Sequence, residues 1–206
     1  EWQSGDWIDA DTYTSGTGGR VSYSYAYWPT LRTEANGDSY RTGNDYENIG
    51  YTYYNTTLYR NFFDVDTSGI VDSHIISAAV WNYRLYFDVT VNVSCQQGTH
   101  DFASFHVDAY NDFSGSVWGT NSSSTAGWKT LTFNATGIAA INKTGTTKIC
   151  MREYDHDVVG TDPGANNYYN RVYHAYNSNN PYLSITATAP PVPTLYFLEQ
   201  LARSRR

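Results

Sequence analysis

The sequence predicts an all-β protein whose strands form a jelly-roll-like two-sheet β-sandwich. In residues 85–95 apolar and polar side chains alternate, which is the period of a strand with one buried face. About ten such short segments follow one another, separated by turn residues and without a helical period. The composition agrees, because the 20 Tyr, 6 Trp and 8 Phe are residues that strands favour. A chain of 206 residues suits one domain of this type.

The individual strands follow from local patterns. Residues 20–28 alternate, with Val21 on the apolar face and Ser22 on the polar face. Residues 58–65 are richer in apolar side chains, which predicts a strand buried on both faces, and 85–95 predict one continuous strand. The other predicted strands span residues 49–54, 102–110, 128–134, 146–154, 168–176 and 181–188.

Three parts of the chain differ in composition. They are an N-terminal arm over residues 1–19, the β-sandwich (jelly roll) domain over 20–188, and a Pro-rich spacer with a short amphipathic tail over 189–206. Within the domain a loop is expected at 111–127 and a short helix at 136–143, the one helix that the pattern of the domain predicts.

Charge and hydropathy exclude two kinds of partner. The net charge is −7 and the acidic residues are dispersed, whereas binding to nucleic acid requires a basic surface. No apolar run approaches the roughly 20 residues that span a bilayer. We therefore expect no nucleic acid partner and no membrane span.

An extracellular, cell-surface location is expected. The chain begins at Glu1 rather than Met, as a secreted product does after removal of an export signal. Asn-x-Ser/Thr sequons, the acceptor sites for covalent N-glycans, occur at Asn55, Asn92, Asn121, Asn134 and Asn142.

The two cysteines, Cys95 and Cys150, allow two interpretations. In an exported chain they favour a disulfide, which would contribute roughly 4 kcal/mol in the chain-entropy model. Cys95 shares its parity with buried valines, whereas Cys150 alternates with Ile149 and Met151, so two buried thiols on neighbouring strands are the alternative.

Most acidic residues are spread along the chain, but some form small groups near the ends of predicted strands. Asp64 and Asp66 are one group, and the second is a set of calcium candidates with hard oxygen ligands: Glu153, Asp155, Asp157 and Asp162. A pair of carboxylates can also hydrolyse a glycosidic bond. Acids that cap turns are the commoner case, so we expect no catalytic residues and no cofactor, with structural calcium as the alternative.

Several blocks of the sequence resemble one known family. Residues 59–70, YRNFFDVDTSGI, and 75–80, IISAAV, resemble the R-x-x-x-x-F-D-T-S-x-I and I-x-S-A-x-L core of disaggregatase-related (DNRLRE-type) domains. Residues 141–152 and 181–186 are similar to later blocks, so the likeness covers about 20–188. It implies a β-sandwich of archaeal and bacterial surface proteins and of phage particles, some of whose relatives are carbohydrate-binding modules. The motifs are core and turn patterns, so they are specific for fold rather than for activity.

The aromatic residues and the tail suggest two functions. Large aromatic rings bind sugar rings or other subunits, and the set expected at the surface is Trp2, Trp7, Tyr46, Tyr53, Tyr54, Trp118, Tyr168 and Tyr169. The tail places an apolar strip on a stiff spacer, which favours insertion into a neighbouring copy. The predicted subunit contacts are Trp2, Trp7, Leu195, Phe197, Leu198 and Leu201.

The leading prediction is an extracellular structural glycoprotein that assembles with copies of itself into a filament, sheath or layer. Head-to-tail contacts of this kind propagate into a homopolymer. The alternative is a carbohydrate-binding module of a secreted or cell-surface protein, and a hydrolase is third.

Overall fold

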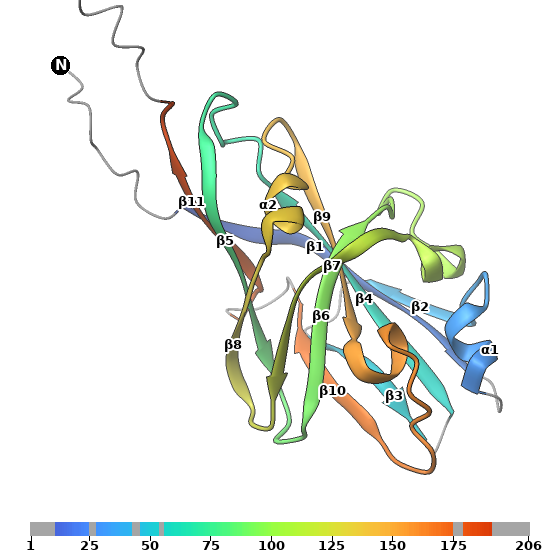
Figure 1. Cartoon of the computed structure of the whole chain (residues 1–206). Coiled ribbons are helices and arrows are strands. Elements are labelled where there is room, and N and C mark those ends of the chain that lie inside the picture. Colours follow the sequence, from blue (N-terminus) through green and yellow to red (C-terminus); the bar gives the residue numbers. More distant parts are fainter. Residues whose placement is uncertain (1–10, 25–27, 43–45, 54–55, 175–178, 191–206) are drawn as a thin grey trace, which may run out of the picture.

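The structure is a computed structural model that describes residues 11–24, 28–42, 46–53, 56–174 and 179–190 (Figure 1). These residues form the predicted all-β fold. The strands are β1 (Asp11–Ser24), β2 (Ser39–Thr42), β3 (Tyr46–Thr52), β4 (Thr57–Asp66), β5 (Ile75–Leu85), β6 (Val91–Gly98), β7 (Phe113–Ser123), β8 (Gly127–Thr132), β9 (Thr146–Glu153), β10 (Tyr168–Tyr173) and β11 (Tyr182–Thr188). Short helical elements are α1 (Trp28–Thr33), the 3₁₀ turn η1 (Val107–Asn111), α2 (Ala135–Ala139) and the π turn η2 (Tyr154–Val158). None of the helices in the described segments has the length and apolar composition that crossing a membrane requires.

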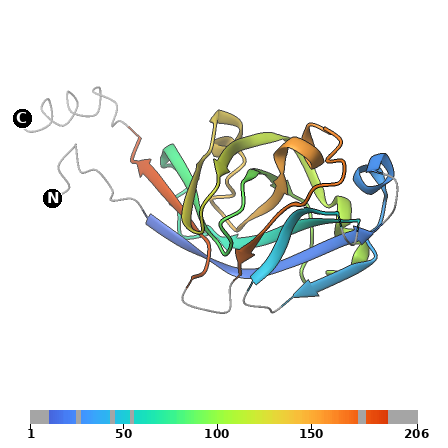
Figure 2. The ribbon, with the colours of Figure 1, turned by 90° about the horizontal axis from the view of Figure 1, so that it is seen from below.

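The strands form one antiparallel sheet that is nearly closed into a barrel. Its order is β2-β1-β11-β5-β10-β3-β4-β9-β6-β7, and β8 pairs with β5. Residues 11–14 of β1 pair with β11, and residues 15–24 pair with β4. Because β4 also leads through β3, β10 and β5 back to β11, these strands close a ring (Figure 2). Residues 61–66 of β4 pair with β9 on the same edge that carries β3, and the sheet continues from β9 into β6 and β7, which supply the second layer of the sandwich.

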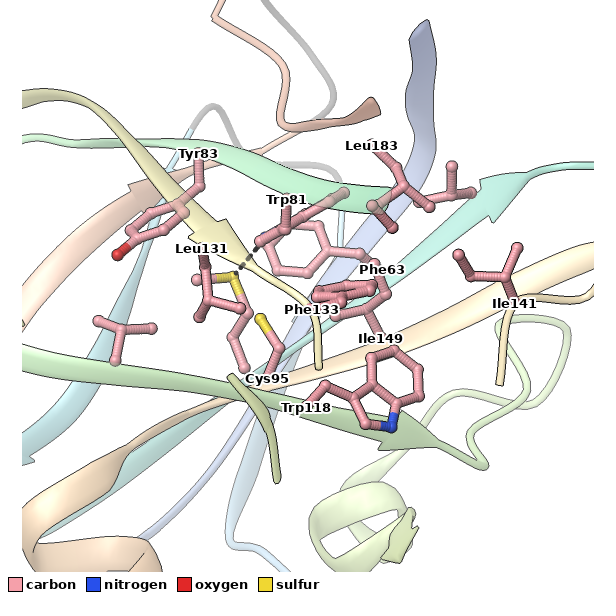
Figure 3. Close-up of a cluster of buried hydrophobic side chains, with 14 of the residues drawn as sticks. Phe63, Trp81, Tyr83, Cys95, Trp118, Leu131, Phe133, Ile141, Ile149 and Leu183 are labelled. Carbon is pink, nitrogen blue, oxygen red and sulfur yellow. Dashed lines mark hydrogen bonds between the residues drawn. The ribbon is translucent and has the colours of Figure 1, made fainter. Parts of the chain in front are cut away.

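The larger hydrophobic cluster fills the interior between the layers. Phe63 of β4 and Trp81 of β5 lie 5.4 Å apart between ring centroids, and Leu131 and Trp118 belong to the same cluster (Figure 3). Trp81 Nε1 donates to Met151 Sδ at 3.2 Å. Each of these fully buried large side chains contributes about 1.5–3 kcal/mol from removal of apolar surface from water.

The smaller cluster lies on the opposite face of β4. Phe62 belongs to it, together with Leu58, Trp28 of α1 and Tyr110 of η1. Since Phe62 and Phe63 are neighbours that point to different clusters, β4 is buried on both faces. This confirms the prediction for residues 58–65.

The prediction of one continuous strand over 85–95 is wrong. β5 ends at Leu85 and β6 begins at Val91, with a turn between them. The buried side chain of Asn170 holds this turn: its Oδ1 accepts from the Phe87 N–H at 3.0 Å, and its Nδ2 donates to the Phe87 carbonyl at 2.9 Å. The apolar alternation continues through the turn, so the pattern did not reveal it.

Two further predictions are wrong in the middle of the chain. Residues 102–110, expected as a strand, form a loop and η1, because the Phe102 and Phe105 rings pack into the smaller cluster. Residues 111–127, expected as a loop, contain β7. Its Gly, Ser and Asn residues have weak strand preference, but pairing with β6 supplies hydrogen bonds that override it.

The cysteines are two buried thiols, so the predicted disulfide is wrong and the alternative is confirmed. In the ladder Cys95 lies opposite Met151, and Cys150 lies opposite Gln96. Cys95 belongs to the larger cluster, where Figure 3 shows it, and Cys150 belongs to the smaller one on the other face. Burial raises the pKa of Cys150 to about 12, so this thiol stays protonated.

Candidate functional site

A polar pocket of about 450 Å³ lies among β1, β2, β3, β4 and β10. These strands pair with one another as neighbours. Its lining consists of arginines, tyrosines, one glutamate and short polar side chains: Arg20, Arg41, Arg171, Tyr46, Tyr59, Glu47, Asn48, Ser22, Ser24, Ser39 and Thr57. The volume is within the usual range for a site that binds a small ligand.

Strand register explains why these side chains meet. On β1, Arg20, Ser22 and Ser24 alternate with Val21, which is buried in the smaller cluster, so the predicted faces of this strand are confirmed. Across the ladder Arg20 lies opposite Asn61 and Ser22 opposite Tyr59, on the side of β4 that also carries Phe63. The part of the pocket lined by Arg20 and Tyr59 is therefore a polar continuation of the inward face of β1 and β4, whereas Tyr46 reaches the pocket from the other face of β3.

Arg20 is the buried cation of the pocket. Its side chain is 9% exposed, and Nη1 lies 3.3 Å from Glu47 Oε2. Its guanidinium stacks on the Tyr59 ring, with Cζ 4.9 Å from the centroid. Its Nε is buried and has no hydrogen-bond partner in the described part of the chain. Burial lowers the pKa of Arg20, and the positive charge of Arg41 acts in the same direction, although Glu47 opposes them.

Arg20 and Arg41 lie directly opposite each other on β1 and β2. Like charges at opposed positions of an antiparallel pair repel. The pocket lining has three arginines and one glutamate, so it is positive in a chain whose net charge is −7. An anionic group placed between the two arginines would relieve their repulsion and accept from the unpartnered Nε.

Aromatic rings stand at the lip of the pocket. Tyr46, which lines the pocket and is 37% exposed, lies 5.2 Å from Tyr86 and 6.2 Å from Tyr173 between ring centroids. Arg171 covers Tyr46, with Cζ 4.8 Å from the ring centroid, and its Nε donates to Asn48 Oδ1 at 3.2 Å. An exposed ring beside fixed hydrogen-bonding groups offers both an apolar face and polar contacts to one ligand.

Of the predicted surface aromatics within the described residues, Tyr46 alone lines the pocket. Trp118, expected at the surface, is 1% exposed and packs 5.0 Å from Phe133, so that prediction is wrong. Tyr53 is exposed, whereas Tyr168 and Tyr169 are half-buried, with Tyr168 stacked 4.0 Å from His156. Tyr54 lies outside the described residues, as do all the predicted subunit contacts: Trp2, Trp7, Leu195, Phe197, Leu198 and Leu201.

The side chains of the four calcium candidates each make hydrogen bonds or ion pairs with other residues of the fold. Glu153 caps η2 and accepts from the N–H of His156 at 2.7 Å. Asp157 is fully buried between Arg60 and Arg152, each 2.7 Å from its Oδ1. Elsewhere, Asp155 accepts from Asn92 Nδ2 and Asp162 accepts from the Gly164 N–H. The described segments contain no group of three or more acidic, His or Cys side chains that could hold a metal ion.

The other acidic group is also occupied by internal contacts. Asp64 Oδ1 lies 2.9 Å from His100 Nε2, and Asp66 Oδ1 accepts from the Ser68 hydroxyl at 2.6 Å in the turn after β4. The hydrogen bonds from Ser68 lower the pKa of Asp66. The two carboxylates therefore serve a strand end and its turn.

The sequon asparagines occupy different environments. Asn134 is exposed and caps α2 by accepting from the Gly137 N–H at 3.0 Å, and Asn142 is exposed in the turn before β9. Asn92 and Asn121 are half-buried on β6 and β7. Asn55 lies outside the described residues. Glycosylation at these positions stays a prediction.

Sequence reasoning missed the arginines of the pocket. A signal was present, because Arg20 shares the polar face of its predicted strand with Ser22 and Ser24. Arg41 and Arg171 gave no such signal, since they reach the pocket through β2 and β10, which pair with β1 and β3.

No protein-family model matches this chain, and no curated protein matches it. The resemblance to disaggregatase-related domains therefore stays a prediction.

Proposed function

We propose that this protein is a carbohydrate-binding module whose pocket receives an acidic sugar. The observation that carries the proposal is the combination of paired arginines, hydroxyl side chains and an exposed tyrosine ring around one pocket. Sugar hydroxyls both donate and accept hydrogen bonds, and the C–H face of a sugar ring packs on an aromatic ring.

Each part of the pocket matches one part of such a ligand. A sugar carboxylate placed between Arg20 and Arg41 would form charge-assisted hydrogen bonds, which are roughly twice as strong as neutral ones. Ser39, Thr57 and Asn48 would bind ring hydroxyls. Tyr46 at the lip would cover the apolar face of the ring.

The test is binding of the full chain to immobilised neutral, amino, sulfated and uronic oligosaccharides, followed by calorimetry. We expect binding to polygalacturonate or polyglucuronate, and loss of at least about tenfold in affinity when the carboxyl groups of the polymer are reduced to alcohols.

Paired variants locate the site. Arg41→Ala should weaken binding by about tenfold or more, whereas Lys143→Ala, which removes the same charge from a surface remote from the pocket, should leave it unchanged. Equal binding by wild type and Arg41→Ala, or no binding to any carbohydrate, would contradict the proposal.

Self-assembly is a second proposal, favoured by the positions of the first and last described strands. Asp11 at the start of β1 pairs with Ile185 near the end of β11, so β1 begins and β11 ends at the same end of the sheet. The sequence before β1 and after β11 supplies an extension on each side. If these extensions bind another copy, light scattering of the full chain at high concentration will detect oligomers. Deletion of residues 189–206 should then restore the monomer.

A further inference from the structure

A row of large side chains crosses the outer face of the sheet, next to the pocket. On β3 and β10, Tyr46 lies opposite Tyr173, and on β5 and β8, Arg84 lies opposite Trp128. The two pairs are joined because Val172 lies opposite Leu85, and Arg84 Cζ is 5.2 Å from the centroid of the Tyr173 ring. We call Tyr46, Tyr173, Arg84 and Trp128 the outer row.

The register places all four side chains on the outer face. Val172 and Leu85, which adjoin Tyr173 and Arg84, are buried in the larger cluster, as is Leu131, three residues after Trp128, and successive side chains of a strand point to opposite faces. Trp128 is 45% exposed, and its ring lies 5.5 Å from that of Tyr182. Neighbouring strands lie about 4.8 Å apart, so the row extends roughly 14 Å from β3 to β8.

The outer row is continuous with the pocket and shares its charge. Tyr46 belongs to both, and Arg171, which lines the pocket, covers the rings of Tyr46 and Tyr86. The cation Arg84 lies within the row, where its Nη1 donates to Asn179 Oδ1. A ligand that leaves the pocket past Tyr46 would therefore meet the Tyr173 ring, the Arg84 cation and then the Trp128 ring in a line.

We propose that the outer row is a second binding site, which receives the continuing chain of an acidic polysaccharide whose end or branch occupies the pocket. The inference rests on the proposed function and adds to it the size of the ligand. An extended chain has a ring face and a carboxylate in every unit, and a line of aromatic rings that includes one arginine offers contacts for both. A single sugar is too short to reach Trp128.

The experiment is calorimetry with galacturonate and glucuronate oligomers, from disaccharide to hexasaccharide, on the full chain. For the wild type we expect affinity to rise by at least about tenfold between the shortest and the longest oligomer of the bound series. Trp128→Ala should remove most of this gain while leaving disaccharide affinity unchanged, and Arg84→Gln should act in the same way.

Tyr40→Ala is the matched control, because Tyr40 is also an exposed ring, at 41%, but lies on β2 against His106 and does not line the pocket. It should leave the whole length series unchanged. Thermal unfolding of each variant confirms that it is folded, and Trp128→Phe should restore part of the gain.

The outcomes separate the two proposals. If the wild type binds oligomers but Trp128→Ala and Arg84→Gln show the wild-type length dependence, the outer row is not a site, although the module still binds carbohydrate. Equal loss for short and long oligomers would also overturn it, since the row would then belong to the pocket. If no oligomer binds, the proposed function itself fails.

Discussion

Two arginine-rich regions of the molecule differ in how completely the fold satisfies them. In the buried cluster of Arg60, Arg152 and Asp157, every N–H of Arg60 has an acceptor, including both oxygens of Asp157, the Tyr110 carbonyl, the Asn111 side chain and the Arg32 carbonyl. In the pocket, Arg20 keeps a buried Nε without a partner in the described residues and faces Arg41 across the ladder.

This difference distinguishes arginines that stabilise the fold from arginines that are available to a ligand. The buried cluster also stacks on aromatic rings, with Arg60 Cζ 4.0 Å from the Tyr110 centroid and Arg152 Cζ 4.1 Å from that of Phe113. The fold itself therefore supplies acceptors for all five N–H groups of Arg60 and for four of the five of Arg152. In the described residues Arg20 has Glu47 and the Tyr59 ring as partners, but its buried Nε has no acceptor, and we infer that a ligand supplies one.

The largest expected effect comes from removing the anion of the buried cluster. Asp157→Asn leaves two buried guanidiniums without their carboxylate and should cost on the order of 3–5 kcal/mol of unfolding free energy, or prevent folding. Urea denaturation measures the loss. The matched control is Asp72→Asn, whose carboxylate is 81% exposed at 3.7 Å from Lys143 and should change stability by less than about 0.5 kcal/mol. Similar losses of unfolding free energy for the two variants would show that the buried carboxylate contributes no more than the exposed one.

Lowering the pH should reduce the free energy of unfolding, first through the buried side chain of His174. Burial lowers the pKa of His174 to about 3, whereas an unfolded histidine titrates near 6.5. Below about pH 6.5 the unfolded chain therefore binds a proton that the folded chain does not. The free energy of unfolding consequently decreases as the pH is lowered.

Asp157 adds a second acidic phase. Burial disfavours its charge, but Arg152 and Arg60 more than offset this and hold its pKa well below the ordinary value near 3.9. Stability from this group is present above about pH 4 and is lost as the pH falls. Each group contributes a slope of at most about 1.4 kcal/mol per pH unit. Urea unfolding at pH 8, 5.5, 4 and 2.5 measures the profile, and His174→Gln should remove the first phase. A flat profile between pH 7 and 4 would contradict the assignment.

The smallest expected change in stability comes from the pocket. Arg41→Gln removes a like charge opposite Arg20, so unfolding free energy should stay within about 0.5 kcal/mol of wild type or rise slightly. Urea denaturation checks this beside the binding assay. A loss comparable with that of Asp157→Asn would show that Arg41 is structural.

Sequence patterns predicted the features that depend on neighbouring residues. The two faces of residues 20–24 and the doubly buried β4 followed from alternation and apolar density. The turn between β5 and β6 did not, because the side chain that holds it, Asn170, lies 83 residues away from Phe87.

Long-range pairing also explains what was missed at the site. Arg60 and Asp157 are 97 residues apart, and nothing in either segment indicates the partner. The same holds for Trp118, which was expected at the surface but is buried against Phe133 because β7 pairs with β6. The pocket could be predicted only once the strand order was known.

The closure of the ring through β1 has a consequence for how the chain folds. The contacts between Asp11 and Ile185 join residues near the two ends of the described chain, and such distant contacts form slowly because a long loop must close first. During synthesis β1 can pair with β4 early, yet its first four residues must wait for β11, the last of the described strands to be made. Until then the edges of β1 and β5 stay open, so nascent chains should be most prone to aggregate in this interval.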